Sequence, residues 1–275
     1  MKIIDVHAHV YPDAVAPLAV RSIGGFYEMP TRLDGTAAGL LQSAEGSGIT
    51  SFVVHAVAVN PRQVSKINAF LAQIARRDPR LIPFAALHPE DPDMEATVAS
   101  LRGEGFCGVK LHPDFQRFPL DGEASIAMFR LVAEYGLPAL IHAGDSRYGY
   151  SHPRQLSALM KAVPKLTVLA AHLGGWSEWR EARELLPGTE RLWVDTSSSL
   201  YALTPEEAAD MIRAYGAERV CFGTDYPMWR PKEEVEKLQR LPLTDGEMEE
   251  VCHSAFENMM QFSGISIPDE PAPKA

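Results

Sequence analysis

Residues 192–223 of the chain read LWVDTSSSLYALTPEEAADMIRAYGAERVCFG, which is two short apolar runs separated by a helical pattern. Apolar residues recur at three- and four-residue intervals over 204–215, and this spacing indicates a helix. Thr204 followed by Pro205 and two glutamates is a typical helix start, and Gly216 is a typical helix end. Because strands joined by a crossover helix run parallel, the segment predicts a parallel strand–helix–strand unit.

The same unit repeats along most of the 275-residue chain. Near-continuous apolar strands are typical of parallel sheets that are covered on both faces, and eight such units fit a closed barrel better than an open doubly wound sheet. We therefore predict an α/β protein with a (β/α)8 barrel in a single domain over residues 1–267. The predicted strands are 3–7, 50–55, 81–87, 106–111, 139–142, 166–172, 192–195 and 220–223, and the predicted crossover helices are 61–77, 93–102, 123–135, 153–163 and 204–215.

Three segments fall outside this repeat. Residues 16–32 contain the pair Gly24 and Gly25 and show no clear periodicity, so we predict a long loop that follows the first strand and lies over the active-site mouth. Residues 244–262 predict a final helix. Residues 268–275 are rich in proline and charge, which predicts a flexible tail.

Composition excludes several classes of partner. The chain has 36 acidic and 26 basic residues, a net charge of −10 and no long run of lysine or arginine, which argues against nucleic acid and anionic membranes. No stretch approaches the ~20 apolar residues of a membrane-spanning helix, and the amino terminus enters a strand pattern without a secretory signal. Three cysteines, an odd number at wide spacing, indicate free thiols in a reducing compartment. We expect a cytoplasmic protein whose partner is a small-molecule substrate.

Histidines concentrate at the carboxyl ends of the predicted strands. In a parallel barrel these ends converge on one rim, so residues far apart in sequence can surround one point. Asp5, His7 and His9 alternate with apolar residues, which places the three polar side chains on one face of a strand. Two imidazoles on one face can share a metal ion; the alternative, a hydrogen-bonded pair in the core, is costly without a ligand. Seven of the nine histidines lie at or near strand ends, namely His7, His9, His55, His88, His112, His142 and His172.

His142, Asp225 and His172 extend this set. His142 ends the fifth predicted strand, although a lone histidine there is also compatible with a structural role. Asp225 closes the eighth strand, where its carboxylate would complete a nitrogen-rich metal site and accept a proton from activated water; its alternative role is to cap the following turn. His172 precedes two glycines that allow a close approach, and we interpret it as a catalytic acid beside the metal or as a ligand.

Four short motifs follow one another along the chain: DVHAH at 5–9, IHAG at 141–144, HLGG at 172–175 and GTDYP at 223–227. Together they resemble the amidohydrolase superfamily, and more narrowly its amidohydrolase-2 branch. Four motifs in this order are far more specific than any one of them alone. The resemblance implies a TIM-barrel enzyme with a metal ion at the carboxyl ends of its strands.

The resemblance also implies a role for each residue. The metal ligands that it implies are His7, His9, His142 and Asp225. His172 then ligates a second metal, as in binuclear relatives, or orients or activates water, as in mononuclear ones. Three imidazoles and a carboxylate suit one Zn²⁺ ion best, with Mn²⁺, Fe²⁺ and Co²⁺ as alternatives.

Three further residues are candidates for substrate binding. Lys110 and His112 belong to a Lys-Leu-His-Pro segment at the fourth predicted strand, where binuclear relatives carry a carboxylated lysine; Lys110 in that role is the alternative to a single-metal site. His112 is expected to meet a substrate carboxylate or to hydrogen-bond toward the metal. Arg147 could pair with an anionic substrate, and its alternative is a solvated surface side chain. We interpret His55 and His88 as hydrogen-bonded barrel residues near the rim.

The function that these residues predict is metal-dependent hydrolysis of an amide, lactone or ester bond. Asp225 would accept the proton of the activated water, and His172 would stabilise the developing oxyanion. The resemblance leaves open non-oxidative decarboxylation of an aromatic or unsaturated carboxylic acid, because the branch contains such enzymes. A non-catalytic barrel with a structural metal is disfavoured, because the predicted site opens on the rim. Monomer and homodimer both stay open.

Overall fold

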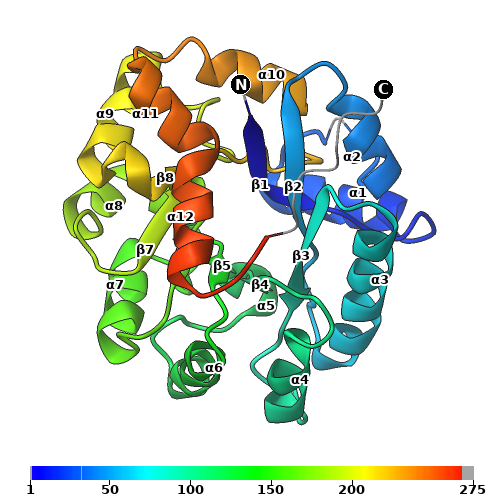
Figure 1. Cartoon of the computed structure of the whole chain (residues 1–275). Coiled ribbons are helices and arrows are strands. Elements are labelled where there is room, and N and C mark those ends of the chain that lie inside the picture. Colours follow the sequence, from blue (N-terminus) through cyan, green and yellow to red (C-terminus); the bar gives the residue numbers. More distant parts are fainter. Residues whose placement is uncertain (1, 32, 268–275) are drawn as a thin grey trace.

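A parallel eight-stranded barrel forms the centre of the computed structural model, which describes residues 2–31 and 33–267. Each strand pairs in parallel with the next, in the order β1 to β8. Beyond β8, His9 N donates to Tyr226 O at 2.8 Å, so the chain after β8 joins β1 and closes the barrel (Figure 1). The predicted single-domain (β/α)8 barrel is confirmed. The strands are β1 (Ile3–His9), β2 (Ile49–His55), β3 (Leu81–Ala86), β4 (Gly108–Leu111), β5 (Ala139–Ile141), β6 (Val168–Ala170), β7 (Leu192–Asp195) and β8 (Val220–Cys221).

Helices surround the barrel and connect successive strands (Figure 1), and the five predicted crossover helices correspond to α3, α4, α6, α7 and α9. At the start of α9, Thr204 Oγ1 accepts from Glu207 N at 3.2 Å, and the Glu207 carboxylate accepts from Thr204 N at 2.9 Å. This capping box stabilises the helix by about 1 kcal/mol. The helices are α1 (Ala16–Tyr27), α2 (Ala37–Ser43), α3 (Val64–Arg77), α4 (Met94–Leu101), α5 (Pro113–Gln116), α6 (Glu123–Glu134), α7 (Pro153–Ala162), α8 (Trp179–Leu185), α9 (Pro205–Tyr215), α10 (Pro231–Leu238), α11 (Asp245–Glu249) and α12 (Ala255–Phe262), with short 3₁₀ turns at Pro61–Gln63, His172–Gly174 and Ala217–Arg219 and a π-helical turn at Glu250–Ser254.

The segment at 16–32 differs from its prediction, because Ala16–Tyr27 forms helix α1 instead of a loop. Two glycines interrupt the apolar periodicity of the segment. Each also costs a helix about 1 kcal/mol relative to alanine. Burial of apolar residues such as Ile23 over the mouth of the barrel stabilises the helix in spite of this cost. The segment does lie over the carboxyl ends of the strands, as predicted, because Ile23 and Tyr27 line the pocket there.

Apolar side chains fill the amino-terminal half of the barrel interior. Leu140 and Leu169 belong to this internal cluster, which packs against Phe256 and Met259 of α12. The final helix predicted over 244–262 is present as α11, the π-helical turn and α12. Helix α12 thus covers the amino-terminal end of the barrel. The polar residues at the carboxyl ends of the strands lie at the opposite end.

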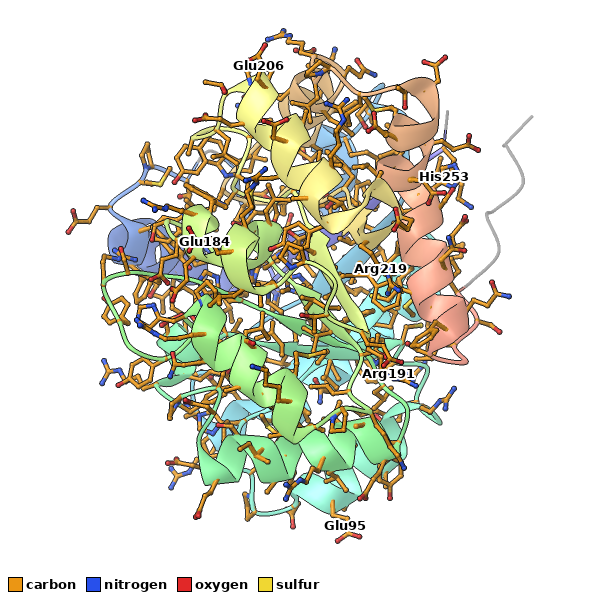
Figure 2. All side chains as sticks on the ribbon, turned by 90° about the vertical axis from the view of Figure 1, so that its left-hand side faces the viewer. Glu95, Glu184, Arg191, Glu206, Arg219 and His253 are labelled. Carbon is orange, nitrogen blue, oxygen red and sulfur yellow. The ribbon has the colours of Figure 1, made fainter. Side chains whose placement is uncertain are left out.

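The two histidines that the sequence leaves away from the strand ends also lie apart from that site. Figure 2 shows His253 on the final helical segment at the periphery, where its Nδ1 lies 3.0 Å from Glu257 Oε2. His152 begins α7, and its Nδ1 lies 2.6 Å from Glu178 Oε1. Both histidines therefore pair with carboxylates of their own.

Cys107, Cys221 and Cys252 are free, as the sequence predicts, and all three are buried. Across the described residues, no helix combines the length and the apolar character that crossing a membrane requires. The predicted flexible tail at 268–275 lies outside the described residues, and the barrel boundary at residue 267 stays a prediction.

Candidate metal centre

Strand β1 delivers His7 and His9 to the carboxyl end of the barrel through an irregular register. Its pairing with β2 shifts between Asp5 and Ala8, so the strict alternation of side chains is broken, as at a β-bulge. Asp5 consequently does not join the histidines as predicted: its carboxylate accepts hydrogen bonds from Thr224 N at 3.0 Å and from Thr224 Oγ1 at 2.6 Å. The two histidines converge, with 3.3 Å between their Nε2 atoms.

His7, His9 and Asp225 form what we call the metal cluster. Asp225 Oδ1 lies 3.5 Å from His7 Nε2 and 3.5 Å from His9 Nε2. The backbone of Asp225 has a φ of 59°, and its N–H donates to His7 O at 2.8 Å, which holds the carboxylate against β1. Ligand atoms about 2.1 Å from a tetrahedral zinc lie roughly 3.4 Å from one another. The three donor atoms therefore have the spacing that one cation requires.

A buried carboxylate at the end of β7 orients His7. Asp195 Oδ2 accepts from His7 Nδ1 at 2.9 Å, and Asp195 Oδ1 accepts from Ser197 N at 3.0 Å. With Nδ1 protonated, His7 presents the lone pair of Nε2 to the metal cluster, as histidine ligands of metals do. Burial lowers the pKa of His7 and of His9 well below the usual value, so both rings are neutral, as ligands must be. Sequence reasoning missed Asp195, although its place at the end of a predicted strand was an available signal.

His55 at the end of β2 is fully buried, yet neither of its ring nitrogens has a hydrogen-bond partner within the described residues. Its ring centroid lies 4.4 Å from that of His9 and 4.9 Å from that of His7. An unpaired buried polar group costs about 1–3 kcal/mol, and a cation among neutral imidazoles removes that cost. His55 is therefore not the hydrogen-bonded residue that the sequence predicts, and its orphaned nitrogens beside the metal cluster fit a bound metal ion.

Lys110 projects from β4 into the same buried space. Its Nζ lies 3.0 Å from His7 Nε2, and its side chain is 1% exposed. Burial lowers the pKa of Lys110 to about 8. Lys110 is paired with Ala86 of β3 and with Leu140 of β5, and this register fixes where its side chain enters the barrel. The structure thus places Lys110 beside the metal cluster, where it can contact a metal ligand or a small reacting group.

His142 and His172 form a pair of their own. His142 Nδ1 lies 2.9 Å from His172 Nε2, and His142 Nε2 lies 2.9 Å from a backbone carbonyl oxygen. His172 Nδ1 in turn lies 2.9 Å from Ser197 Oγ. Both nitrogens of His142 therefore have partners outside the metal cluster, although His142 and His172 line the same small pocket as His9 and Asp225. The structure brings three of the four predicted ligands together and leaves His142 beside them.

His112 and Arg147 are both engaged by protein groups. His112 stacks on His142 with 3.8 Å between ring centroids, and its Nε2 lies 2.8 Å from the hydroxyl oxygen of Tyr27. Arg147 donates to the two oxygens of Asp145 at 2.9 and 2.8 Å, and to a carbonyl oxygen of α1 at 2.7 Å. The guanidinium thus ties the loop after β5 to α1, and its role toward an anionic substrate stays a prediction.

Asp114 is a second buried carboxylate that sequence reasoning missed, although it directly follows the Lys-Leu-His-Pro segment. Its Oδ2 accepts from Ser151 Oγ at 2.5 Å and lies 3.6 Å from His142 Nε2. Its Oδ1 has no partner among the described residues. Burial raises the pKa of Asp114 to about 7. This carboxyl therefore borders the histidine pair with one oxygen free to bind a further group.

The pocket between the metal cluster and the histidine pair is small and enclosed. Its volume is about 10 Å³, which is close to the space that one water molecule needs. Tyr27 of α1 and Met228, which follows β8, form walls of this pocket. Such walls keep bulk water away, and electrostatic interactions inside the pocket are correspondingly stronger.

A protein-family model described as amidohydrolase matches residues 4–255. The chain belongs to the amidohydrolase-2 family. The resemblance predicted from the four motifs is therefore confirmed, and with it the expectation of an enzyme family. A search of curated proteins finds no match to this amidohydrolase-2 member.

Solved structures share the barrel of this amidohydrolase-2 protein. An uncharacterized TIM-barrel protein from Bordetella bronchiseptica is 22% identical, with a TM-score of 0.77 over 96% of this chain and 100% of that one. A dihydroxybenzoic acid decarboxylase from a Polaromonas species, with bound manganese and an inhibitor, is 15% identical, with a TM-score of 0.73 over 95% and 97%. A protein from Pseudomonas putida assigned as a 2-pyrone-4,6-dicarboxylic acid hydrolase is 20% identical, with a TM-score of 0.67 over 94% and 97%. At these identities the likeness establishes the fold.

Proposed function

We propose that this protein is a metal-dependent hydrolase that cleaves an amide, lactone or ester bond of a small-molecule substrate. The observation that carries the proposal is the metal cluster, in which two neutral imidazoles and the Asp225 carboxylate meet within 3.5 Å at the carboxyl end of a barrel. This donor set suits one Zn²⁺ ion, with His142 as the further ligand that family resemblance implies. Mn²⁺, Fe²⁺ and Co²⁺ are alternatives, and a structurally similar decarboxylase binds manganese.

Asp225 is the residue that we assign to proton transfer. A divalent cation held here would supply Lewis-acid chemistry, because it polarises a carbonyl oxygen and favours the ionisation of water. Burial raises the pKa of Asp225 above its usual value, so the carboxylate can take a proton from the attacking water closer to neutral pH. Ser198 Oγ donates to Asp225 Oδ2 at 2.5 Å, and Trp229 Nε1 donates to Ser198 Oγ at 2.8 Å. These two hydrogen bonds orient the proposed base.

We assign His172 to stabilise the oxyanion that develops on the substrate. Its Nδ1 is held by Ser197 Oγ at 2.9 Å, and its backbone carbonyl accepts from Trp179 Nε1 at 3.0 Å. The ring is therefore fixed: its Nε2 lies 2.9 Å from His142 Nδ1, and the side chain lines the same pocket as Asp225. A pre-oriented donor at this place costs no reorganisation when charge develops.

Decarboxylation of an aromatic carboxylic acid is the second candidate. The observation that favours it is the aromatic character of the walls, since Tyr27, Trp176 and Tyr201 line a pocket together with His172 and Asp225. Flat rings pack well against such side chains, and this pocket of about 10 Å³ has to widen to admit one. Several similar structures are benzoate-type decarboxylases, among them a 2,6-dihydroxybenzoate decarboxylase of 16% identity. Release of carbon dioxide, as opposed to hydrolytic products, separates the two reactions.

Metal content is the first test. We expect about one zinc per chain by elemental mass spectrometry, and loss of that zinc in a His7→Ala, His9→Ala double variant. Wild-type protein that binds neither zinc nor any other divalent ion under saturating conditions would overturn the metal-dependent mechanism.

The second test is turnover by the metal-loaded protein with p-nitrophenyl esters, lactones and amides, alongside carbon dioxide release from 2,6-dihydroxybenzoate. Asp225→Asn should lower kcat by about 10²–10⁴-fold while the circular dichroism spectrum stays unchanged. Asp145→Asn is the matched control, because that buried carboxylate pairs with Arg147 and lies outside the metal cluster. Near-wild-type turnover in Asp225→Asn would refute the assignment of the base.

A further inference from the structure

A cavity of about 540 Å³ lies between α1 and α3, next to the pocket of the metal cluster. Volumes of this size hold drug-sized ligands. Its lining is largely apolar, and three rim side chains are markedly exposed, namely Val15 at 47%, Leu18 at 65% and Val59 at 52%. The wall formed by α1 is one helical face, because its members recur every three or four residues. They are Leu18, Ala19, Ser22, Ile23 and Phe26, together with Val15, which caps the helix.

Ile23 and Phe115 line both this cavity and the metal-cluster pocket. Phe115 stacks on His112 with 3.8 Å between ring centroids, and His112 stacks in the same way on His142. Ile23 lies on α1, the helix that covers the pocket (Figure 1 shows α1 and α3 on the same side of the barrel). In the described part of the chain the two spaces are therefore separated by the thickness of single side chains.

Charge at the cavity favours a neutral or anionic occupant. Lys66 and Arg117 line it, and neither forms a salt bridge with any described residue. Asp114 also lines it, but that carboxyl is only 3% exposed and accepts from Ser151. The accessible charges at this apolar cavity are thus positive.

We propose that the cavity between α1 and α3 binds the apolar part of the substrate, an acyl chain or aryl substituent, while the bond that reacts lies at the metal cluster. The substrate class is then an amide or ester with a sizeable apolar acyl group instead of a short polar metabolite. This inference rests on the proposed function, because it names the substrate of the same site. The apolar part of the substrate would pass between Ile23 and Phe115 to reach the cavity.

Alkyl hydroxamates test the link between the two spaces without requiring turnover, because they chelate divalent metals and carry a chain of chosen length. Each buried methylene raises affinity about fourfold, so octanohydroxamate should bind zinc-loaded protein at least about a hundredfold more tightly than acetohydroxamate, as measured by calorimetry. Ala19→Trp fills the cavity and should remove this gain while leaving acetohydroxamate binding unchanged. Arg21→Trp, on the same helix but outside the cavity lining, should preserve the gain. Equal affinities for the two hydroxamates, or a gain that Ala19→Trp leaves intact, would overturn the proposal.

A fluorescent aromatic anion, 1-anilinonaphthalene-8-sulfonate, tests the cavity independently of the metal. In the His7→Ala, His9→Ala double variant it should bind, be displaced by octanoate, and lose binding when Ala19→Trp is added. Failure of Ala19→Trp to reduce binding would overturn the cavity as a ligand site. Probe binding as expected, together with no hydroxamate binding by wild-type protein, would instead overturn the proposed metal-dependent function and its substrate link.

Discussion

Asp195→Asn tests how the protein orients His7 toward a metal. The carboxylate accepts every hydrogen bond that it makes: His7 Nδ1 donates to Oδ2 at 2.9 Å, and the backbone N–H groups of His172 and Ser197 donate to Oδ1 at 3.1 and 3.0 Å. The Ser197 hydroxyl also donates to Oδ1. Asparagine keeps the shape but offers an acceptor at only one end. It can satisfy the two backbone donors only by turning its NH₂ group toward His7.

That orientation reverses the tautomer of His7. Its Nδ1 must then accept a hydrogen bond, so the proton moves to Nε2 and the lone pair is lost from the metal cluster. Loss of such an orienting partner lowers metal affinity by about 10–100-fold, or about 1.4–2.7 kcal/mol. The opposite amide orientation would leave two buried backbone N–H groups unpaired at about 1–3 kcal/mol each, which is why we expect the first.

Competition with a chromophoric chelator measures the zinc affinity of Asp195→Asn and of wild type, and urea unfolding of the metal-free proteins measures their stability. Asp145→Asn is the control, because it removes a buried carboxylate that bonds to Arg147 and to no member of the metal cluster. An unchanged zinc affinity in a folded Asp195→Asn protein would refute this account of His7.

Three further predictions concern groups around the cluster. His55→Leu should raise the unfolding free energy of the metal-free protein by about 1 kcal/mol, because it removes an unpaired buried imidazole, and it should lower the zinc affinity. The control is His88→Leu, which should leave the zinc affinity unchanged, because the His88 ring accepts a hydrogen bond from a backbone N–H. Equal effects of the two substitutions on zinc affinity would contradict the reasoning. Burial raises the pKa of Asp114 from 3.8 to about 7, so the folded protein keeps a proton that the unfolded chain has lost; the stability this contributes is complete below pH 3.8 and is lost as pH rises to about 7. Urea unfolding at a series of pH values should show that the unfolding free energy of Asp114→Asn declines less between pH 3.8 and about 7 than that of wild type. Identical declines in the two proteins would count against the raised pKa. Arg147→Ala should speed hydrogen exchange of α1, because the guanidinium bonds to a carbonyl at its end, whereas unchanged exchange would show that the bond does not hold the helix.

Most of the fold could be predicted because its signals are local. The strand–helix–strand pattern of 192–223 depends on side-chain periodicity and on capping residues, and both act within a few neighbours. Helix α1 could not be predicted in the same way, because Gly24 and Gly25 weaken its local signal and burial of Ile23 against the barrel compensates for them.

In the candidate site, too, the local features could be predicted and the long-range contacts could not. His7 and His9 were predicted because they stand two residues apart on one strand, and Asp225 because it follows the last strand. The orientation of each ring could not be predicted, because it depends on partners far away in sequence: Asp195 lies 188 positions from His7, and His172 lies 30 positions from His142. A hydrogen bond between such residues exists only once the barrel has closed.

By itself, the sequence determined the barrel, the family and the set of polar residues that collect at one rim, because periodicity and short motifs are properties of neighbouring residues. Only the tertiary structure decided the finer chemistry. It placed Lys110 beside His7, left His55 buried without a partner, paired His142 with His172 instead of with the metal cluster, and opened an apolar cavity under α1. Each of these depends on the register of closed strands and on the packing of a helix, and neither is a property of any single segment.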